Sequence, residues 1–263
     1  MKKYRKPYRI KKKKPIFRNR FFRLGILILI LLFTIYYLLF LSQAFQIEKI
    51  IITGEEKVST QDLKLFVEKK LEKTILFFKT KSIFLINSNE IKKDISKNFP
   101  QIAEVEIKRG FPDALNIVVI ERLGLALWCY DEKCFLLDNE GVIFEETSPE
   151  INLIKLVNKQ KPALPILGEK VIEKELLSQI LEIEAKIKND LKISIAEILF
   201  VSEERLDFKT SEGWEIYFNP QKDINWQLTK LRAVLEDGIL LEKRKDLESI
   251  ELRFGNFANP KYR

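Results

Sequence analysis

The chain has 263 residues, with 46 Lys and Arg against 38 Asp and Glu and no histidine, so its formal net charge is +8. The lack of histidine removes the commonest general base and metal ligand, which disfavours most hydrolytic and zinc-dependent enzymes. Residues 1–23 hold twelve Lys or Arg and no acidic residue, so removing this +12 from the total of +8 leaves −4 for residues 24–263. The positive charge is therefore a property of the tail, and the remainder gives no reason to expect a nucleic-acid partner.

An uncharged apolar run of 18 residues follows the tail, at 24–41. As a helix it would span roughly 27 Å, about the thickness of the hydrocarbon core of a bilayer. Ser42-Gln43-Ala44 resembles a signal-peptide cleavage site, but the apolar core of a signal peptide is shorter, at about 7–15 residues. We therefore predict a retained transmembrane helix at 24–41, with the basic tail 1–23 in the cytoplasm and residues 46–263 outside it.

The next segment predicts a small α+β domain at residues 46–122. A strand at 47–54 is followed by a helix that begins near Thr60, and a second helix runs from Asn87 to Phe99. Two strands, at 102–110 and 114–122, complete the order β-α-α-β-β.

Residues 123–263 predict a mixed α/β domain with a mostly antiparallel sheet. A strand meander at 123–146 precedes an irregular, proline-containing connection at 147–168. Amphipathic helices are expected at 173–190 and from Asp223 to Asp237, on either side of three strands. The chain is then expected to end in one strand and a short tail.

Cys129 and Cys134 are the only cysteines, and four residues between two apolar runs separate them. If those runs pair as a hairpin, the two residues face each other and can form a disulfide outside the cytoplasm. Free buried thiols are the alternative, and a metal site is disfavoured because two thiols without histidine supply only half a zinc site.

No motif in the chain requires catalysis. No serine has a lysine three residues later, and neither the P-loop pattern nor the dinucleotide-binding glycine pattern is present. The adjacent acids Glu145-Glu146 and Glu203-Glu204 are expected to be solvated, and Trp128, Trp214 and Trp226 to belong to the core rather than to a sugar site. We therefore predict no enzyme activity, no cofactor and no metal.

Four short segments, in this order and spacing, resemble the FtsQ/DivIB family of bacterial cell-division proteins: residues 98–122, 138–146, 164–168 and 249–256. One departure is Leu123-Gly124-Leu125-Ala126, where the family usually has Pro-x-Ala after its Glu-Arg pair. The resemblance implies a POTRA domain at 46–122 and a β domain at 123–263. It also implies a non-catalytic, single-pass type II protein of the inner (cytoplasmic) membrane at the division septum, with no small-molecule substrate.

The resemblance further implies two single-pass partners, FtsB (DivIC) and FtsL, in the complex that controls septal peptidoglycan synthesis. The family binds its partner by strand addition at the C-terminal edge, which here falls on Glu251, Leu252, Arg253, Phe254 and Phe257. An unpaired strand edge offers N–H and C=O groups to a second chain. We expect the segment from Glu251 to Phe257 to be the last strand, with Arg253 and Phe254 on opposite faces and Arg253 meeting an acidic partner residue. The alternative is an ordinary inner strand with Leu252 in the core.

Two other functions are weighed against this one. POTRA domains also serve outer-membrane assembly and secretion, but those proteins carry a C-terminal barrel of alternating strands, for which residues 122–263 are too few. A membrane-anchored cell-wall enzyme is disfavoured by the absence of any catalytic motif.

Overall fold

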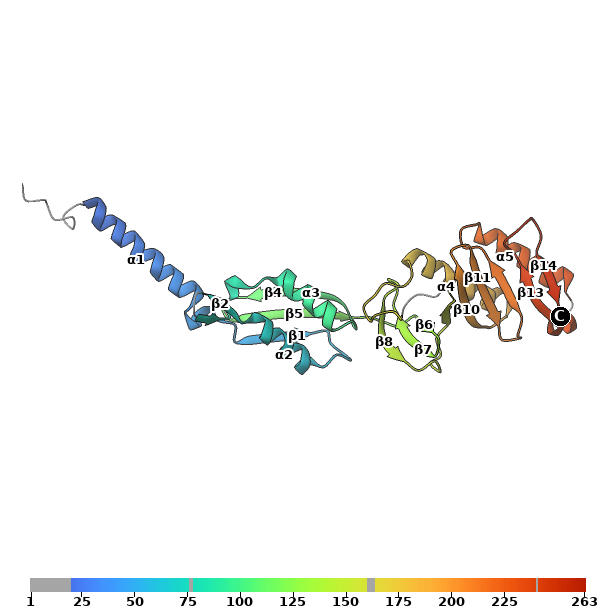
Figure 1. Cartoon of the computed structure of the whole chain (residues 1–263), viewed down its shortest axis with the longest axis horizontal. Coiled ribbons are helices and arrows are strands. Elements are labelled where there is room, and N and C mark those ends of the chain that lie inside the picture. Colours follow the sequence, from blue (N-terminus) through green and yellow to red (C-terminus); the bar gives the residue numbers. More distant parts are fainter. Residues whose placement is uncertain (1–19, 76–77, 160–163, 240) are drawn as a thin grey trace, which may run out of the picture. The chain divides into compact units, whose positions relative to one another are not determined.

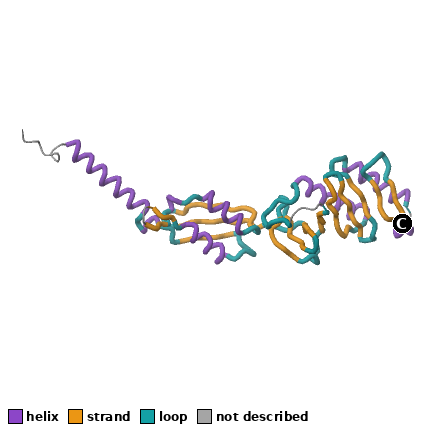
Figure 2. The backbone as a smooth tube through the Cα atoms, viewed as in Figure 1, coloured by secondary structure: helices purple, strands orange, loops and turns teal. Residues whose placement is uncertain are grey.

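The structure is a computed structural model that describes residues 20–75, 78–159, 164–239 and 241–263 (Figure 1). Most of the predicted basic tail therefore lies outside the described residues. The chain divides into two compact units, of which the second holds Gly54–Thr60, Lys92–Glu106 and Val118–Arg263. Helices, strands and loops alternate along the whole described part (Figure 2).

Helix α1 (Arg20–Phe40) is the membrane-spanning candidate. It is 21 residues long, has a mean hydropathy of 2.3 over its most apolar 18 residues, and buries none of them in the protein. Its length of roughly 31 Å matches the hydrocarbon core of a bilayer. The Thr34 hydroxyl donates to the Ile30 carbonyl inside the helix, at 2.9 Å, so this polar side chain of the run is satisfied. The helix begins four residues before the predicted position and therefore includes Arg20 and Arg23.

The first α+β module follows the predicted order, with one added hairpin. Its sheet has the strand order β1-β5-β4, and β2 pairs with β3 in a separate two-stranded sheet that the sequence did not predict. The elements are η2 (Gln43–Phe45), β1 (Lys49–Thr53), α2 (Thr60–Leu71), β2 (Lys73–Ile75), β3 (Phe78–Thr80), η3 (Ile83–Leu85), α3 (Ser88–Asn98), β4 (Ile102–Gly110) and β5 (Ala114–Glu121). Asn87 caps α3 as expected, because its Oδ1 accepts from the Glu90 N–H at 3.3 Å.

At the end of β5, the Glu121 carboxylate binds three consecutive backbone N–H groups, those of Glu56, Lys57 and Val58, at 2.9–3.0 Å. Partial burial opposes ionisation of this carboxyl, but the hydrogen bonds from Val58, Glu56 and Lys57 outweigh it and lower the pKa of Glu121. The ionised side chain thus holds the turn after β1.

We expect Glu121→Gln to lower the free energy of unfolding by about 1–2 kcal/mol at neutral pH, because a charge-assisted acceptor is lost. Since the folded-state pKa is depressed, the carboxylate stabilises the fold above its ordinary pKa of about 4.3, and this stabilisation is lost as the pH falls through the folded value. Urea unfolding at several pH values should therefore show the wild type and the variant converging in acid. Glu104→Gln, at an exposed position of β4, is the control; a pH-independent gap for Glu121→Gln would contradict the assignment.

The second domain is built on a nine-stranded sheet with the order β14-β13-β12-β11-β10-β9-β6-β7-β8. Five of its eight strand pairs are antiparallel, and β6-β9, β9-β10 and β12-β13 are parallel. The strands are β6 (Ala126–Tyr130), β7 (Lys133–Leu137), β8 (Ile143–Thr147), β9 (Lys155–Asn158), β10 (Ile195–Ser202), β11 (Arg205–Thr210), β12 (Glu215–Phe218), β13 (Leu247–Glu251) and β14 (Asn259–Tyr262). This arrangement confirms the predicted fold class.

Two of these strands correct the sequence-based prediction. Residues 147–168 were expected to be irregular, but β9 lies within them and joins the β6 and β10 halves of the sheet. The chain end was expected to be a tail, but β14 pairs antiparallel with β13. Both strands have only four residues, and Pro260 lies inside β14, so neither has the apolar alternation that identifies a strand.

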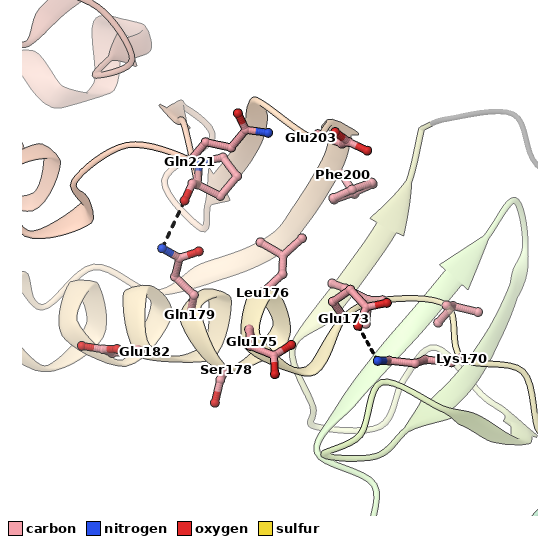
Figure 3. Close-up of a pocket in the computed structure, with 13 residues that line it drawn as sticks. Lys170, Glu173, Glu175, Leu176, Ser178, Gln179, Glu182, Phe200, Glu203 and Gln221 are labelled. Atoms are coloured by element: carbon pink, nitrogen blue, oxygen red, sulfur yellow. Dashed lines mark hydrogen bonds and ion pairs between the residues drawn. The ribbon is translucent and has the colours of Figure 1, made fainter.

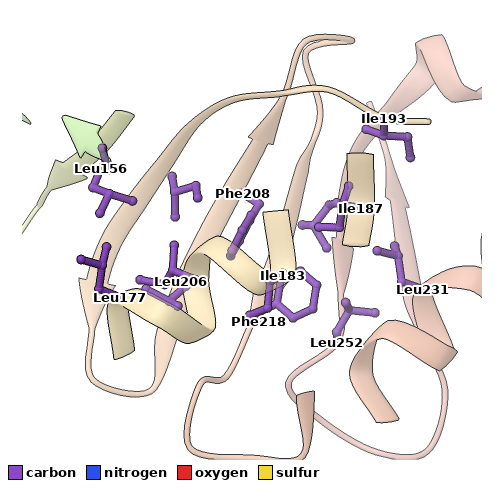
Figure 4. Close-up of a cluster of buried hydrophobic side chains, with 14 of the residues drawn as sticks. Leu156, Leu177, Ile183, Ile187, Ile193, Leu206, Phe208, Phe218, Leu231 and Leu252 are labelled. Atoms are coloured by element: carbon purple, nitrogen blue, oxygen red, sulfur yellow. The ribbon is translucent and has the colours of Figure 1, made fainter. Parts of the chain in front are cut away.

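Helices cover one face of the sheet and enclose the core (Figure 4). Helix α4 (Lys174–Leu191) buries one residue per turn, including Ile183 and Ile187, against Phe208 and Phe218 of the sheet. Helix α5 (Ile224–Ala233) adds Leu231 and continues as η4 (Val234–Gly238), which η5 (Leu241–Asp246) follows. The helical spacing predicted from the sequence therefore describes the face of α4 that contacts the core.

The Cys129–Cys134 hairpin has the register Cys129↔Cys134, and a disulfide joins the two residues, whose Cα atoms are 4.1 Å apart. Both cysteines are buried beside Leu127 and Phe144. The bond thus closes the two-residue turn between β6 and β7.

The sheet has two edge strands, β8 and β14, and they differ. The first residue of β8, Ile143, donates to the Glu169 carbonyl at 3.1 Å and accepts from the Gly168 N–H at 2.7 Å. Glu145 and Glu146 follow in the same strand. A crossing segment and two carboxylates therefore protect the β8 edge, as is common at sheet edges.

Candidate functional site

A cavity of about 790 Å³ lies beside the first turns of α4 (Figure 3). Ile172, Leu176 and Phe200 give it an apolar lining, while Glu175 and Glu203 stand at its rim. Ser178 also lines the cavity, and among the described residues no hydrogen bond joins its hydroxyl to Glu175 or Glu182, whose carboxylates face solvent.

No cluster of three or more His, Cys, Asp or Glu side chains that could hold a metal ion occurs in the described part of the chain. Trp128 and Trp214 are buried in the core, as expected, whereas Trp226 is about half exposed on α5. Trp226 lies near the C-terminal end of the sheet, where it lines a cavity together with Phe257, one of the predicted partner-binding residues.

The expected geometry of residues 251–257 is wrong. Strand β13 ends at Glu251, and residues 252–258 form an irregular loop that leads into β14. Because β14 pairs along β13, the outer edge of the sheet is β14 rather than the segment from Glu251 to Phe257. We call residues 252–258 the β13–β14 loop.

Three of the five predicted residues turn toward their own chain. Leu252 is fully buried in the core, as predicted by the alternative in which this segment belongs to the interior of the domain. The Arg253 guanidinium donates to the Glu251 carboxylate at 2.5 and 2.9 Å, and the Arg253 N–H adds a third bond at 2.9 Å. Burial opposes ionisation of Glu251, but these bonds to Arg253 lower the pKa of its carboxyl. Arg253 is thus already paired, and its planar fork is occupied within the chain.

The other two predicted residues face outward. Phe254 is 57% exposed and Phe257 is 79% exposed. Phe257 lines a cavity of about 430 Å³ together with Trp226, Val234 and Ala258. We call Phe254, Phe257, this cavity and the outer edge of β14 the C-terminal surface. Exposed aromatic side chains beside an apolar cavity are typical of a protein-binding surface.

Two lysines hold the β13–β14 loop in place. Lys230 is buried, and its ammonium lies within hydrogen-bond distance of the carbonyls of Leu252, Phe254 and Gly255. Lys222 donates to the Arg253 carbonyl at 2.9 Å, and its ammonium lies 5.5 Å from the centre of the Phe254 ring. Burial lowers the pKa of Lys230, and the charge of Lys222 lowers it further. The carbonyls of the loop, which no strand pairs, are therefore satisfied by side-chain ammonium groups.

Lys230→Met should release this loop while keeping a side chain of similar length. Since up to three carbonyls lose their donor, we expect a loss of about 1–3 kcal/mol in unfolding free energy and faster hydrogen exchange across residues 252–258. Lys222→Met, which removes one exposed donor, should have a smaller effect on both measurements. Unchanged exchange in the Lys230 variant would show that the ammonium does not hold the loop.

The outer edge of β14 offers few backbone groups. In an antiparallel pair, every second residue directs its N–H and C=O groups toward the neighbouring strand. The Arg263 N–H donates to the Asp246 carbonyl at 2.9 Å, so the backbone groups of Lys261 and Asn259 also point toward β13. The backbone groups of Pro260 and Tyr262 therefore point away from β13. Because Pro260 lies at such a position, its missing N–H costs no hydrogen bond to β13. The outward groups are two carbonyls and the N–H of Tyr262.

Comparison with known proteins identifies both domains. Residues 45–122 match the family model described as "POTRA domain, FtsQ-type", and residues 126–253 match "Cell division protein FtsQ/DivIB, C-terminal". The cell division protein DivIB of Clostridium tetani is 26% identical over 185 residues, which cover 68% of this chain and 68% of that protein. FtsQ of Rickettsia bellii is 31% identical over 116 residues, or 44% of this chain and 40% of that protein. The match to FtsQ of Rickettsia therefore spans less than half of that relative.

The sequence and the fold together define the class of protein: a membrane-anchored chain with a POTRA domain and a mixed α/β C-terminal domain. The chain belongs to the FtsQ/DivIB family of bacterial cell-division proteins. The alternative of an outer-membrane assembly protein gains no support, because the region after the POTRA domain matches a division-protein domain.

Proposed function

We propose that this protein is a non-catalytic, single-pass scaffold of the division machinery at the septum. Its N-terminus lies in the cytoplasm and its two domains lie outside it, and they recruit FtsB/DivIC-like and FtsL-like partners that help to control septal peptidoglycan synthesis. Family membership supports the process, and the basic tail before α1 supports the orientation. The observation that carries the proposal is the open β14 edge with two exposed phenylalanines beside it.

The partner would add a strand to β14 and place apolar side chains against Phe254 and Phe257. Backbone hydrogen bonds would fix the register, and the cavity beside Trp226 would accept one anchoring side chain. Leu252, Glu251 and Arg253 would contribute indirectly, because their contacts position the loop that carries the two phenylalanines.

Tyr262→Pro tests the strand-addition step. It removes the only outward N–H expected on β14, so we expect partner capture to fall at least tenfold, about 1.4 kcal/mol, in a pull-down from membranes. Tyr262→Ala is the matched control, since it removes the same side chain and keeps the N–H. Equal capture by the proline and alanine variants, both with wild-type melting temperatures, would exclude addition to this edge.

A further inference from the structure

The end of the membrane span is hydrogen-bonded to the POTRA domain. The Leu39 carbonyl accepts from the Ser82 hydroxyl at 2.7 Å, and the Phe40 carbonyl accepts from the Thr80 hydroxyl at 2.7 Å and the Gln46 amide at 3.2 Å. These carbonyls belong to the last turn of α1, whose C=O groups have no partner within a helix. An unpaired carbonyl is costly next to hydrocarbon, so buried Ser82 and Thr80 serve as a cap for the span.

The cap places residues 80–84 at the boundary of the membrane. Helix α1 is about as long as the hydrocarbon core is thick, so its last carbonyls lie where the headgroup layer begins. That layer is roughly 5–8 Å deep on each side. Side chains that project from residues next to Ser82 and Thr80 are therefore within reach of it.

Three aromatic rings gather at this place. The ring of Phe84 lies 5.2 Å from that of Phe45 and 5.6 Å from that of Phe111, between ring centres. Phe84 is 36% exposed and Phe111 is 60% exposed, although rings that pack together in a soluble domain are normally covered. Lys79 and Lys81 flank the cap and lie 3.7 and 3.8 Å from the Glu72 carboxylate, in ion pairs that leave the Lys79 side chain largely exposed.

We propose that Phe84 and Phe111 insert into the headgroup region of the bilayer and seat the base of the POTRA domain on the membrane surface. Aromatic rings with neighbouring lysines are characteristic of the membrane–water interface, where the rings lie at headgroup depth and the ammonium groups meet lipid phosphates. The occupant of this surface is lipid because the rings adjoin a span that is itself in the bilayer. The domain is then restrained at two points, the cap on α1 and the inserted rings.

Depth measurements on the full-length chain in vesicles of phosphatidylethanolamine and phosphatidylglycerol test this proposal. Both native cysteines are in a disulfide, so a single introduced cysteine can carry a nitroxide spin label. Phe111→Cys reports on the proposed surface. Ile120→Cys is the matched control, because Ile120 is 55% exposed and lies about 20 Å further along, near the other end of β5.

The label at 111 should collide more often with oxygen, which concentrates in lipid, than with a water-soluble nickel chelate, and the label at 120 should show the reverse. Equal, water-like accessibility at both positions would overturn the proposal. Low accessibility to both reagents at 111 would also overturn it, since it would indicate cover by protein instead of lipid. Neither result depends on a division partner, so this test is separate from that of the proposed function.

Discussion

Replacing Phe254 and Phe257 together by serine should reduce partner affinity at least about a hundredfold, or roughly 2.7 kcal/mol. Central aromatic side chains commonly contribute 2 kcal/mol or more each to a protein interface, although paired losses are not additive. The melting temperature should stay within a few degrees of wild type, because both side chains are largely exposed. Titration of the purified outer region with the partner's outer segment measures the first effect, and calorimetry measures the second.

Ile166→Ser provides the control for this double variant. Ile166 is as exposed as Phe257 and lies on the connection before α4, outside the C-terminal surface. It should bind the partner as the wild type does. Equal losses for the control and the double variant would mean that exposed apolar area in general, and not this surface, drives the association.

Trp214→Ala should give the largest loss of stability. The Trp214 ring is fully buried in the core, and its Nε1 donates to the Glu212 carboxylate at 2.9 Å. Removing a buried tryptophan leaves a cavity and costs about 3–5 kcal/mol, which corresponds to roughly 10 °C or more for a domain of this size. Chemical denaturation should show this loss in the midpoint.

Trp226→Ala is the matched comparison, because Trp226 is half exposed beside the cavity of the C-terminal surface. It should lower the unfolding free energy by less than about 1 kcal/mol and yet weaken partner binding. The two tryptophans thus separate stability from association. If both substitutions lower the unfolding free energy equally, weaker partner binding by the Trp226 variant would reflect loss of the fold and not loss of an exposed contact.

The sequence predicted the elements whose side chains repeat with a regular period. Helix α4 follows this rule, because Leu177, Ile180, Ile183 and Ile187 mark one face, and the meander at β6–β8 alternates or forms a short apolar run. Strand β9 has no such pattern. Its position between β6 and β10 depends on parallel pairing with strands distant in sequence, which local periodicity does not report.

The candidate site was predictable only in part. Phe254 and Phe257 are exposed, but their predicted setting was wrong because the residues after them were expected to form a tail. A proline such as Pro260 is tolerated on the outer side of an edge strand, so β14 can form there. Lys230 was missed, since a lysine in a helix is ordinarily solvated. The sequence did contain a signal for its burial, because helical spacing places Lys230 on the same face of α5 as Gln227 and Leu231, and this face is buried.

The protected β8 strand limits how these molecules can assemble. A head-to-tail polymer of sheets needs two complementary open edges on every subunit, so that each copy both receives and donates a strand. Here the segment at 168–169 occupies the start of β8, and an added strand would have to pack beside the charged side chains of Glu145 and Glu146. If a partner adds a strand to β14 as proposed, the covered β8 edge limits each molecule to one added strand, and the complex cannot extend into a sheet polymer.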